Sequence, residues 1–405
     1  MTTSQRAGLA TPPPEPAPLN IVNHYTTLIS NDHTLTPPIA AIESLLALLS
    51  SSHLTTISET LNLLAAASQT LLSSLANPIP VSAGTDLLQR YLLTSFQASP
   101  ITAQSGSDFT QLRRQLINNT KLFVARTRTA RAKIARYALP LIRDGAVVVT
   151  YAASRVIESA LYHAAEQNRD FRVILIMPGS HDTCSTIDNN NVSSTTTTTS
   201  TQSTRTSRTE AIASHLRTLS VPTALIPLSA LSHALSTIPT TNTLFLLGAD
   251  AILENGAPLA TQGTRLVAEI AKLRNRECYF AAESYKFVRR FPLTYGDRDL
   301  VGMGARQEVV RFEGGAVVED HEREEEGESK VALGEEKEFD FSVGLSSQSQ
   351  FQSQSKSQSE SDSHSQIQSQ EQVDITPPEL VSSLITEEGV MSLQGVSEEL
   401  IKLWF

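Results

Sequence analysis

The chain has 405 residues, 40% of them hydrophobic, and a formal net charge of -10 at pH 7. That apolar content is enough for the cores of two ordinary domains, but no run approaches the roughly 18 apolar residues of a membrane helix. The start lacks the basic and apolar regions of a secretory signal, and two cysteines, Cys184 and Cys278, are too few for a disulfide framework or a thiolate zinc site. We expect a cytoplasmic protein that needs no metal and no other cofactor.

The net charge describes one segment and not the folded surface. Residues 319–340 hold eleven acidic residues and three basic ones, so they carry eight of the negative charges. We predict that an acidic and Ser/Gln-rich insert at 316–372 is disordered, together with a Ser/Thr-rich insert at 180–208 and a proline-rich lead at 1–19. None of these segments can bury enough apolar surface to offset the entropy of ordering.

Residues 20–140 have the pattern of packed helices. Apolar residues recur at spacings of three and four, which is the period of an amphipathic helix. Pro37 and Pro38 fit the first turn of one helix, where a missing amide donor costs little, and Thr36 is placed to cap it. The pattern predicts an N-terminal helical domain.

The stretch from Arg113 to Arg143 contains nine basic residues and no acidic one. Such a stretch can recognise nucleic acid or phosphate, or it can be a helix whose charges face solvent while its apolar side packs on a core. No exposed aromatics are interleaved with the charges, as they are in many single-strand-binding surfaces. We therefore expect the second arrangement and no direct nucleic-acid partner.

Beyond residue 141, short apolar runs alternate with helical stretches. The runs are at 146–150, 173–177, 223–227, 244–247 and 278–281, and the helices between them are expected at 152–167, 209–219 and 262–275. This alternation is typical of buried parallel strands in a doubly wound sheet. It predicts an α/β, Rossmann-like domain made of 141–315 and 373–405. The last stretch is expected to form a turn and two short helices.

Ligands of such sheets bind beyond the carboxyl ends of the strands. Tyr151, Ser154 and Arg155 follow the first run at the mouth of a helix, where backbone amides and a guanidinium can hold an anion. Asp250 and Asn255 follow the fourth run. These residues are pocket candidates, and the alternative for them is helix capping and turn formation.

Several motifs give a specific resemblance. They are TPPIAAIESLLALL (36–49), AKIARYALPLIRDGAVVVTYAASRV (132–156), GADAILENG (248–256), AAESYKFVRRFPL (281–293) and VSEELIKLWF (396–405). With these motifs the chain resembles the alpha/beta/delta subunit family of eukaryotic initiation factor 2B, and within it the alpha subunits. The resemblance implies a helical domain followed by a Rossmann-like domain.

The resemblance also implies a function and a set of partners. Such a subunit is a non-catalytic, regulatory homodimer that bridges two halves of a decameric guanine-nucleotide exchange factor. Its neighbours are the beta and delta subunits and, through them, the catalytic gamma and epsilon subunits. It helps sense phosphorylation of the alpha subunit of initiation factor 2. We expect the apolar carboxyl terminus, with Leu400, Ile401, Leu403 and Trp404, to supply subunit contacts.

The same superfamily contains sugar-phosphate isomerases, including methylthioribose-1-phosphate isomerase, and this gives the alternative function. Those enzymes pair a cysteine after the first strand with the aspartate of the Gly-Ala-Asp motif. Here Asp250 is present, but Tyr151 and Ala152 stand where the cysteine belongs. We therefore expect a pocket that survives without catalysis and binds a sugar phosphate. The residues expected to line it are Tyr151, Ser154, Arg155, Asp250, Asn255 and Lys286.

Overall fold

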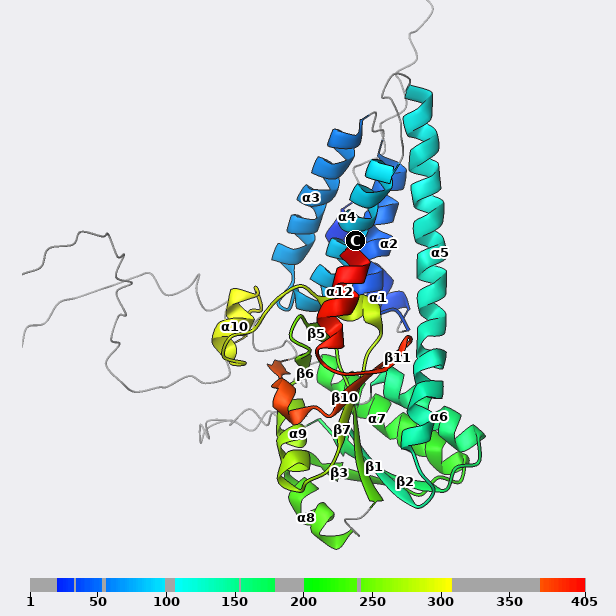
Figure 1. Cartoon of the computed structure of the whole chain (residues 1–405), viewed down its shortest axis with the longest axis vertical. Helices are drawn as coiled ribbons and strands as arrows, with labels where there is room; N and C mark the ends of the chain where they lie inside the picture. Colours follow the sequence, from blue (N-terminus) through cyan, green and yellow to red (C-terminus); the bar gives the residue numbers. More distant parts are fainter. Residues whose placement is uncertain are drawn as a thin grey trace, which may run out of the picture. The chain divides into compact units, whose positions relative to one another are not determined.

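The computed structural model describes residues 20–32, 34–52, 56–98, 106–152, 154–178, 200–238, 242–307 and 372–404. The described chain begins with helices that pack on one another, and continues into two β-sheets with further helices (Figure 1). No helix in these ranges is long and apolar enough to cross a bilayer.

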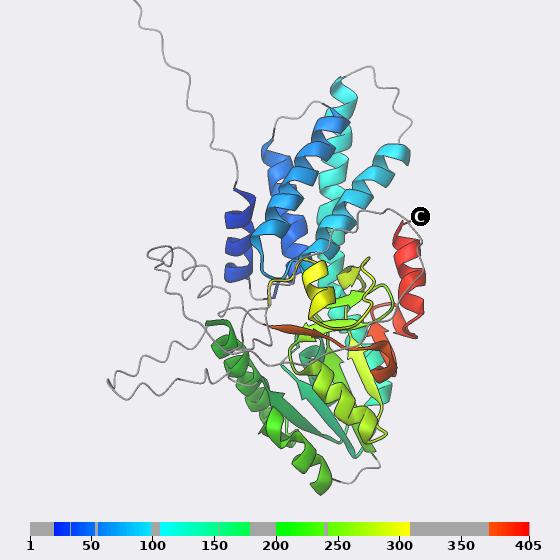
Figure 2. The same ribbon diagram turned by 90° about the vertical axis from the view of Figure 1, so that its left-hand side faces the viewer.

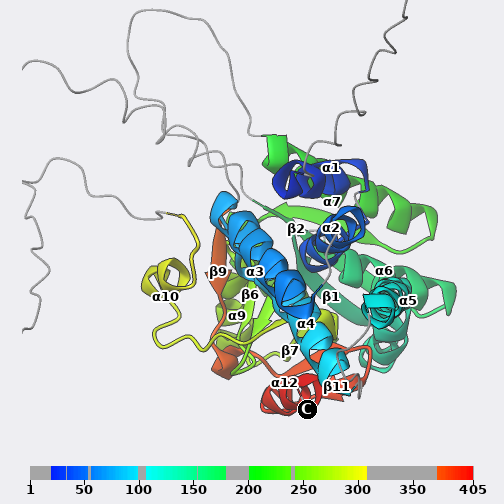
Figure 3. The ribbon, with the colours of Figure 1, turned by 90° about the horizontal axis from the view of Figure 1, so that it is seen from above.

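The N-terminal part is helical, as the apolar spacing predicts. Its described helices are α1 (Ile21–Asn31), α2 (Pro37–Ser51), α3 (Ile57–Ser74), α4 (Ile79–Ala98) and α5 (Gly106–Ala138). Figures 2 and 3 show α2, α3 and α4 side by side. Their apolar faces meet in a buried cluster that contains Ile42, Leu45, Leu64 and Leu92. Thr36 is the residue before α2, as predicted, although its side chain makes no capping hydrogen bond.

The larger sheet contains every strand that the apolar runs predict. Its strands are β1 (Ala146–Tyr151), β2 (Phe171–Met177), β3 (Thr223–Pro227), β4 (Thr243–Gly248), β7 (Cys278–Ala281), β10 (Ser383–Thr386) and β11 (Gly389–Met391). Their spatial order is β11-β10-β7-β4-β1-β2-β3. All neighbours are parallel except β10 and β11. The predicted α/β class with a parallel sheet is confirmed.

Helices cover both faces of this sheet (Figure 1). On one face α6 (Arg155–Glu166), α7 (Ser200–Thr218) and the end of α5 pack against side chains such as Val148. On the other face α8 (Leu231–Thr237), α9 (Thr264–Leu273) and α12 (Gly395–Trp404) pack against side chains such as Val149. Successive residues of β1 thus enter different cores, which is why its sequence is continuously apolar.

A second sheet was not predicted. Its strands, in spatial order, are β8 (Phe287–Val288), β5 (Ala251–Leu253), β6 (Pro258–Thr261) and β9 (Val373–Ile375). It packs against Ile79 and Ala83 of α4 and against Leu300 of α10 (Asp297–Gly302). Short 3-10 turns complete the described chain at Leu139–Leu141, Leu228–Ala230, Ser284–Lys286 and Pro378–Leu380.

Two predictions need correction. The carboxyl-terminal stretch forms β9, the strands β10 and β11, and the helix α12, where two short helices were expected. Helix α7 begins at Ser200, so the predicted insert 180–208 ended too late. Ile212 and Leu216 of α7 are buried against the sheet. The helix therefore packs on the core, although the residues at its start are polar and suggest no such packing. The predicted lead and most of both inserts lie outside the described residues.

Candidate functional site

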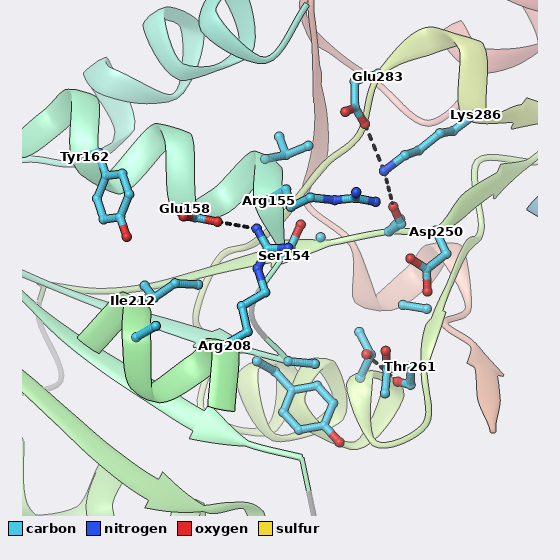
Figure 4. Close-up of a pocket in the computed structure, with 18 of the residues that line it drawn as sticks. Ser154, Arg155, Glu158, Tyr162, Arg208, Ile212, Asp250, Thr261, Glu283 and Lys286 are labelled. Atoms are coloured by element: carbon cyan, nitrogen blue, oxygen red, sulfur yellow. Dashed lines mark hydrogen bonds and ion pairs between the residues drawn. The ribbon is translucent and has the colours of Figure 1, made fainter. Parts of the chain in front are cut away.

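A pocket of about 720 Å³ lies at the carboxyl ends of β1 and β4 (Figure 4). This is the edge of the sheet at which a ligand site is expected. The lining residues come from β1, α6, α7, β4, β6, the start of α9 and the turns next to these strands and after β7. They are Tyr151, Ala152, Ser154, Arg155, Val156, Glu158, Tyr162, Ser207, Arg208, Ala211, Ile212, His215, Gly248, Ala249, Asp250, Ala260, Thr261, Thr264, Glu283 and Lys286.

The turn from β1 into α6 forms one wall of the pocket. Ala152 adopts a left-handed conformation with φ of 57°, which reverses the chain between strand and helix. Ser154 precedes the first turn of α6, and its side chain lies directly against Gly248: a Cβ added at Gly248 would fall 2.0 Å from Ser154 Oγ. The close approach of β4 and α6 therefore requires glycine at this position.

A buried carboxylate organises the opposite wall. Glu283 is fully buried, and its Oε2 lies 2.8 Å from Lys286 Nζ while its Oε1 lies 3.1 Å from Arg131 Nε. Lys286 Nζ also donates to the carbonyl of Ala249, 2.9 Å away. Burial alone would raise the pKa of Glu283, but the charges of Lys286 and Arg131 outweigh it and lower this pKa to about 2. The carboxylate is therefore ionised at neutral pH.

Arg155 connects the pocket to the N-terminal helices. Its Nη1 donates a 2.7 Å hydrogen bond to the carbonyl of Leu35, in the turn between α1 and α2. Burial lowers the pKa of Arg155, and the nearby positive charges of Arg131 and Arg208 lower it further. A further ion pair joins Arg208 of α7 to Glu158 of α6.

The structure brings together most of the predicted pocket residues. Tyr151, Ser154, Arg155, Asp250 and Lys286 all line the pocket. Asn255 does not. Its Oδ1 accepts from the backbone N–H of Ala257 and its Nδ2 donates to the hydroxyl of Tyr295, so it stabilises the turn between β5 and β6. This is the turn-forming alternative that the sequence left open.

Five charged or aromatic lining residues were not predicted: Glu158, Tyr162, Arg208, His215 and Glu283. Arg208 fell within the predicted insert. Glu283 is separated from the end of β7 by Ala282 alone, and its position after a strand end was the available signal. The side chain of Arg131, expected to face solvent with the rest of its basic stretch, is instead largely buried beside Glu283.

The pocket contains groups that can bind a ligand, but no described cysteine lines it to pair with Asp250 as in the isomerases. Tyr151, one of the two residues in place of the isomerase cysteine, donates its hydroxyl to the carbonyl of Gln262 at 2.6 Å. Cys278 is buried in the core of the sheet, where burial raises the pKa of its thiol to about 12. Cys184 lies outside the described residues. In the described part of the chain, no cluster of His, Cys, Asp or Glu could hold a metal ion.

The predicted interface residues of the carboxyl terminus have different environments. Leu400 is buried in the chain's own core against the sheet, so it stabilises the docking of α12. The side chain of Ile401 is 55% exposed. The side chains of Leu403 and Trp404 lie outside the part of the chain that the structure describes.

Comparisons with known proteins identify relatives of this chain. The translation initiation factor eIF2B subunit alpha of Caenorhabditis elegans is 23% identical over 385 residues, which cover 95% of this chain and 98% of that protein. The ribose 1,5-bisphosphate isomerase of Thermococcus kodakarensis is 28% identical over 187 residues, which cover 46% of this chain and 49% of that enzyme.

A solved structure extends the likeness to the fold. A chain of the tetrameric eIF2B-beta2-delta2 complex from C. thermophilum matches with a TM-score of 0.60 and 16% identity, over 95% of this chain and 94% of that chain. The model of the initiation factor 2 subunit family matches residues 34–393, which include the described helices from α2 to α10 and both sheets. The chain therefore belongs to the initiation factor 2 subunit family.

Proposed function

We propose that this chain is a non-catalytic regulatory subunit of the guanine-nucleotide exchange factor for initiation factor 2, of the alpha type. The observation that carries this proposal is the alignment with an alpha subunit over nearly the full length of both proteins. The shared isomerase-like segment covers less than half of this chain, so it accounts for only part of the sequence.

The subunit acts through assembly in the cytoplasm. It forms a homodimer that bridges two halves of a decamer and contacts the beta and delta subunits, and through them the gamma and epsilon subunits. The exposed side of α12, which carries Ile401, is a candidate contact surface. Assemblies of this kind commonly use large apolar interfaces.

The N-terminal helices serve regulation. They present a surface to the phosphorylated alpha subunit of initiation factor 2, and binding there favours a state of the complex with lower exchange activity. Such an effect requires that the phosphorylated partner bind the two states with different affinities. The contacts of Arg131 and Arg155 with the turn before α2 support a mechanical connection between this surface and the sheet.

Co-expression with beta and delta subunits tests the assembly. The full chain should co-purify with them and sediment as a dimer by itself, and the assembled complex should retain phosphorylated alpha subunit more strongly than the unphosphorylated form. Ile401→Asp should weaken assembly, while Val301→Asp, at another exposed apolar side chain, should not. A chain that stays monomeric and does not associate with beta or delta would exclude the proposed role.

Isomerase activity is the second candidate, because Asp250 is retained in the pocket and one relative is named as an isomerase. The described pocket lacks the thiol that would complete an acid/base pair with Asp250. Turnover of ribose 1,5-bisphosphate or methylthioribose 1-phosphate by the purified chain, abolished in Asp250→Asn, would establish this activity. We expect no turnover.

The pocket itself is proposed to bind a sugar phosphate without converting it, and so to stabilise the dimer. Tyr151, Ser154, Arg155, Asp250 and Lys286 supply donors and acceptors around it. Asn255 is left out of this set because it holds a turn. Hexose monophosphates should raise the melting temperature of the chain. Absence of any shift at millimolar ligand would remove this part of the proposal.

A further inference from the structure

A second cavity, of about 690 Å³, lies between α5 and α6. Its lining is rich in basic side chains. The titratable residues among those lining it are Arg131, Arg136, Arg155, Glu158, Tyr162, His163, Glu166 and Arg208. Four of them, Arg155, Glu158, Tyr162 and Arg208, also line the pocket at the strand ends, so the two cavities share a wall.

The two cavities differ in charge. In the strand-end pocket, three cations (Arg155, Arg208, Lys286) are balanced by three anions (Glu158, Asp250, Glu283). In the second cavity, four arginines face two carboxylates, Glu158 and Glu166, which leaves two positive charges in excess. Adding the adjacent buried pair of Glu283 and Lys286 does not change this excess. The second cavity is therefore the more favourable of the two for an anion.

Like charges are crowded at the shared wall. Arg131 and Arg208 both lie close enough to Arg155 for their positive charges to lower its pKa. Bringing three guanidinium groups together costs free energy, and a phosphate placed among them would remove part of that cost. Guanidinium groups also bind phosphate oxygens in a bidentate manner, which gives this cluster a chemical preference.

Of the four arginines that line the second cavity, Arg136 is the one best placed to bind a ligand. It lies one turn after Ala132 on α5, its side chain is exposed, and it lines the second cavity. Within the described residues it makes neither a hydrogen bond nor an ion pair, whereas Arg131 pairs with Glu283 and Arg208 pairs with Glu158. A ligand that enters the second cavity can bind Arg136 without breaking any described contact.

We propose that the cavity between α5 and α6 binds a phosphate group, and that a small ligand with two phosphates on a sugar-sized body reaches from the strand-end pocket into it. Arg136 then determines the preference for the second phosphate. This inference rests on the proposed sugar-phosphate pocket for the first half of the ligand. Each cavity by itself has the volume of an ordinary small-molecule site, so the second phosphate does not have to share the space of the sugar.

The test is calorimetric titration of the full chain with a hexose 6-phosphate, a hexose 1,6-bisphosphate and inorganic phosphate. Arg136→Gln removes the proposed contact, and Lys133→Gln removes an exposed cation from the same helix that does not line the cavity. The bisphosphate should bind wild type and Lys133→Gln at least about tenfold more tightly than the monophosphate, since a charge-assisted contact contributes about 1.5 to 3 kcal/mol. Arg136→Gln should lose most of this advantage and keep its monophosphate affinity.

The results of these titrations distinguish binding in the strand-end pocket from binding in the second cavity. Equal affinities for the monophosphate and bisphosphate in wild type, or an equal loss in both variants, would overturn the inference. If inorganic phosphate bound wild type but not Arg136→Gln, the phosphate site in the second cavity would be supported even without monophosphate binding. Its ligand would then be a phosphate that does not extend from the strand-end pocket. Assembly with beta and delta subunits, measured on the same preparations, reports on the proposed function independently. Unchanged melting temperatures of both variants would show that the fold is intact.

Discussion

Nη1 of Arg155 donates a 2.7 Å hydrogen bond to the carbonyl oxygen of Leu35, although the two residues are 120 positions apart in the chain. Arg131 makes a similar contact next to it, since its Nη2 donates to the carbonyl of Thr34 at 2.8 Å. The turn between α1 and α2 is thus held by two guanidinium groups from the lining of the two cavities. A change in the charge or position of Arg155 therefore alters the contact that holds the turn between the first two helices.

Replacing Arg155 with methionine should loosen this turn. The variant keeps a long apolar side chain but leaves the carbonyl of Leu35 without its charged donor. We expect the free energy of unfolding to fall by about 1.5 to 3 kcal/mol, the range for a hydrogen bond to a charged group. Hydrogen exchange of the α1 and α2 amides should become faster. Urea unfolding and exchange mass spectrometry measure the two effects.

Arg172→Met is the matched control, because the side chain of Arg172 is exposed on β2 and makes no hydrogen bond or ion pair with the described residues. It should change neither quantity measurably. If Arg155→Met exchanged at α1 and α2 as slowly as the control, the turn would not depend on this guanidinium.

Glu283→Gln should destabilise the fold more than any surface change. The variant leaves Lys286 and Arg131 facing a neutral amide in a buried site, and removing one partner of a buried ion pair typically costs about 3 to 5 kcal/mol. The pKa of Glu283 is lowered to about 2, so its ionised form stabilises the native state at neutral pH. That contribution should decline in wild type as pH falls from about 4.5 towards 2.

Glu269→Gln provides the comparison, since its ion pair with Arg265 is half-exposed. Its effect should be about 0.5 kcal/mol or less. Urea unfolding of both variants at pH 7 and of wild type at pH 3 to 7 provides the measurement. Similar losses in the two variants would contradict the role assigned to Glu283.

The sequence predicted the larger sheet well because its central strands are buried on both faces and appear as continuous apolar runs. It did not reveal β10 as a strand, because β10 is joined to the sheet by pairing with β7, for example Leu384 with Phe280, and β7 is distant in the sequence. The same limit applied to the pocket: the sequence reveals residues whose place next to a strand can be recognised locally, and it does not reveal distant partners. Tyr151 at the end of β1 and Asp250 just after β4 were found. Glu283 also follows a strand, but it was missed because its role depends on Arg131, a partner distant in the sequence.

Asp374 should give the protein a distinctive pH dependence. Burial raises its pKa to about 7, although the backbone N–H groups of Arg265 and Gly263 donate to its Oδ2 and oppose the shift. In the unfolded chain the same group titrates near 3.8. Between these two values the native state holds a proton that the unfolded state has lost, so the free energy of unfolding should decrease as pH rises from about 4 to 7.

Asp374→Asn should flatten this part of the stability profile, because the amide still accepts a hydrogen bond but does not titrate. Urea unfolding at intervals between pH 4.5 and 7.5 shows the slope. Asp170→Asn, at an exposed carboxylate, should leave the slope as it is in wild type. An Asp374→Asn profile parallel to the wild-type profile would mean that Asp374 titrates alike in both states.

Gln307 and Val373, which flank the segment 308–371 in the sequence, contact each other. Gln307 Nε2 donates to the carbonyl of Val373 at 2.9 Å, and the N–H of Val373 donates to Gln307 Oε1 at 2.9 Å. The amide side chain of Gln307 therefore holds the backbone before and after this segment side by side. We predict that replacing residues 309–370 with a short Gly/Ser linker changes the melting temperature little, because the cost of closing a loop varies slowly with its length.

The matched variant is Gln307→Ala within the shortened chain. It removes both contacts and leaves the backbone groups of Val373 without these partners, so it should destabilise the shortened chain by about 1 to 2 kcal/mol. Association with beta and delta subunits should survive the replacement if the segment takes no part in assembly. A shortened chain that misfolds despite an intact Gln307 would show instead that residues 309–370 contribute to the stability of the fold.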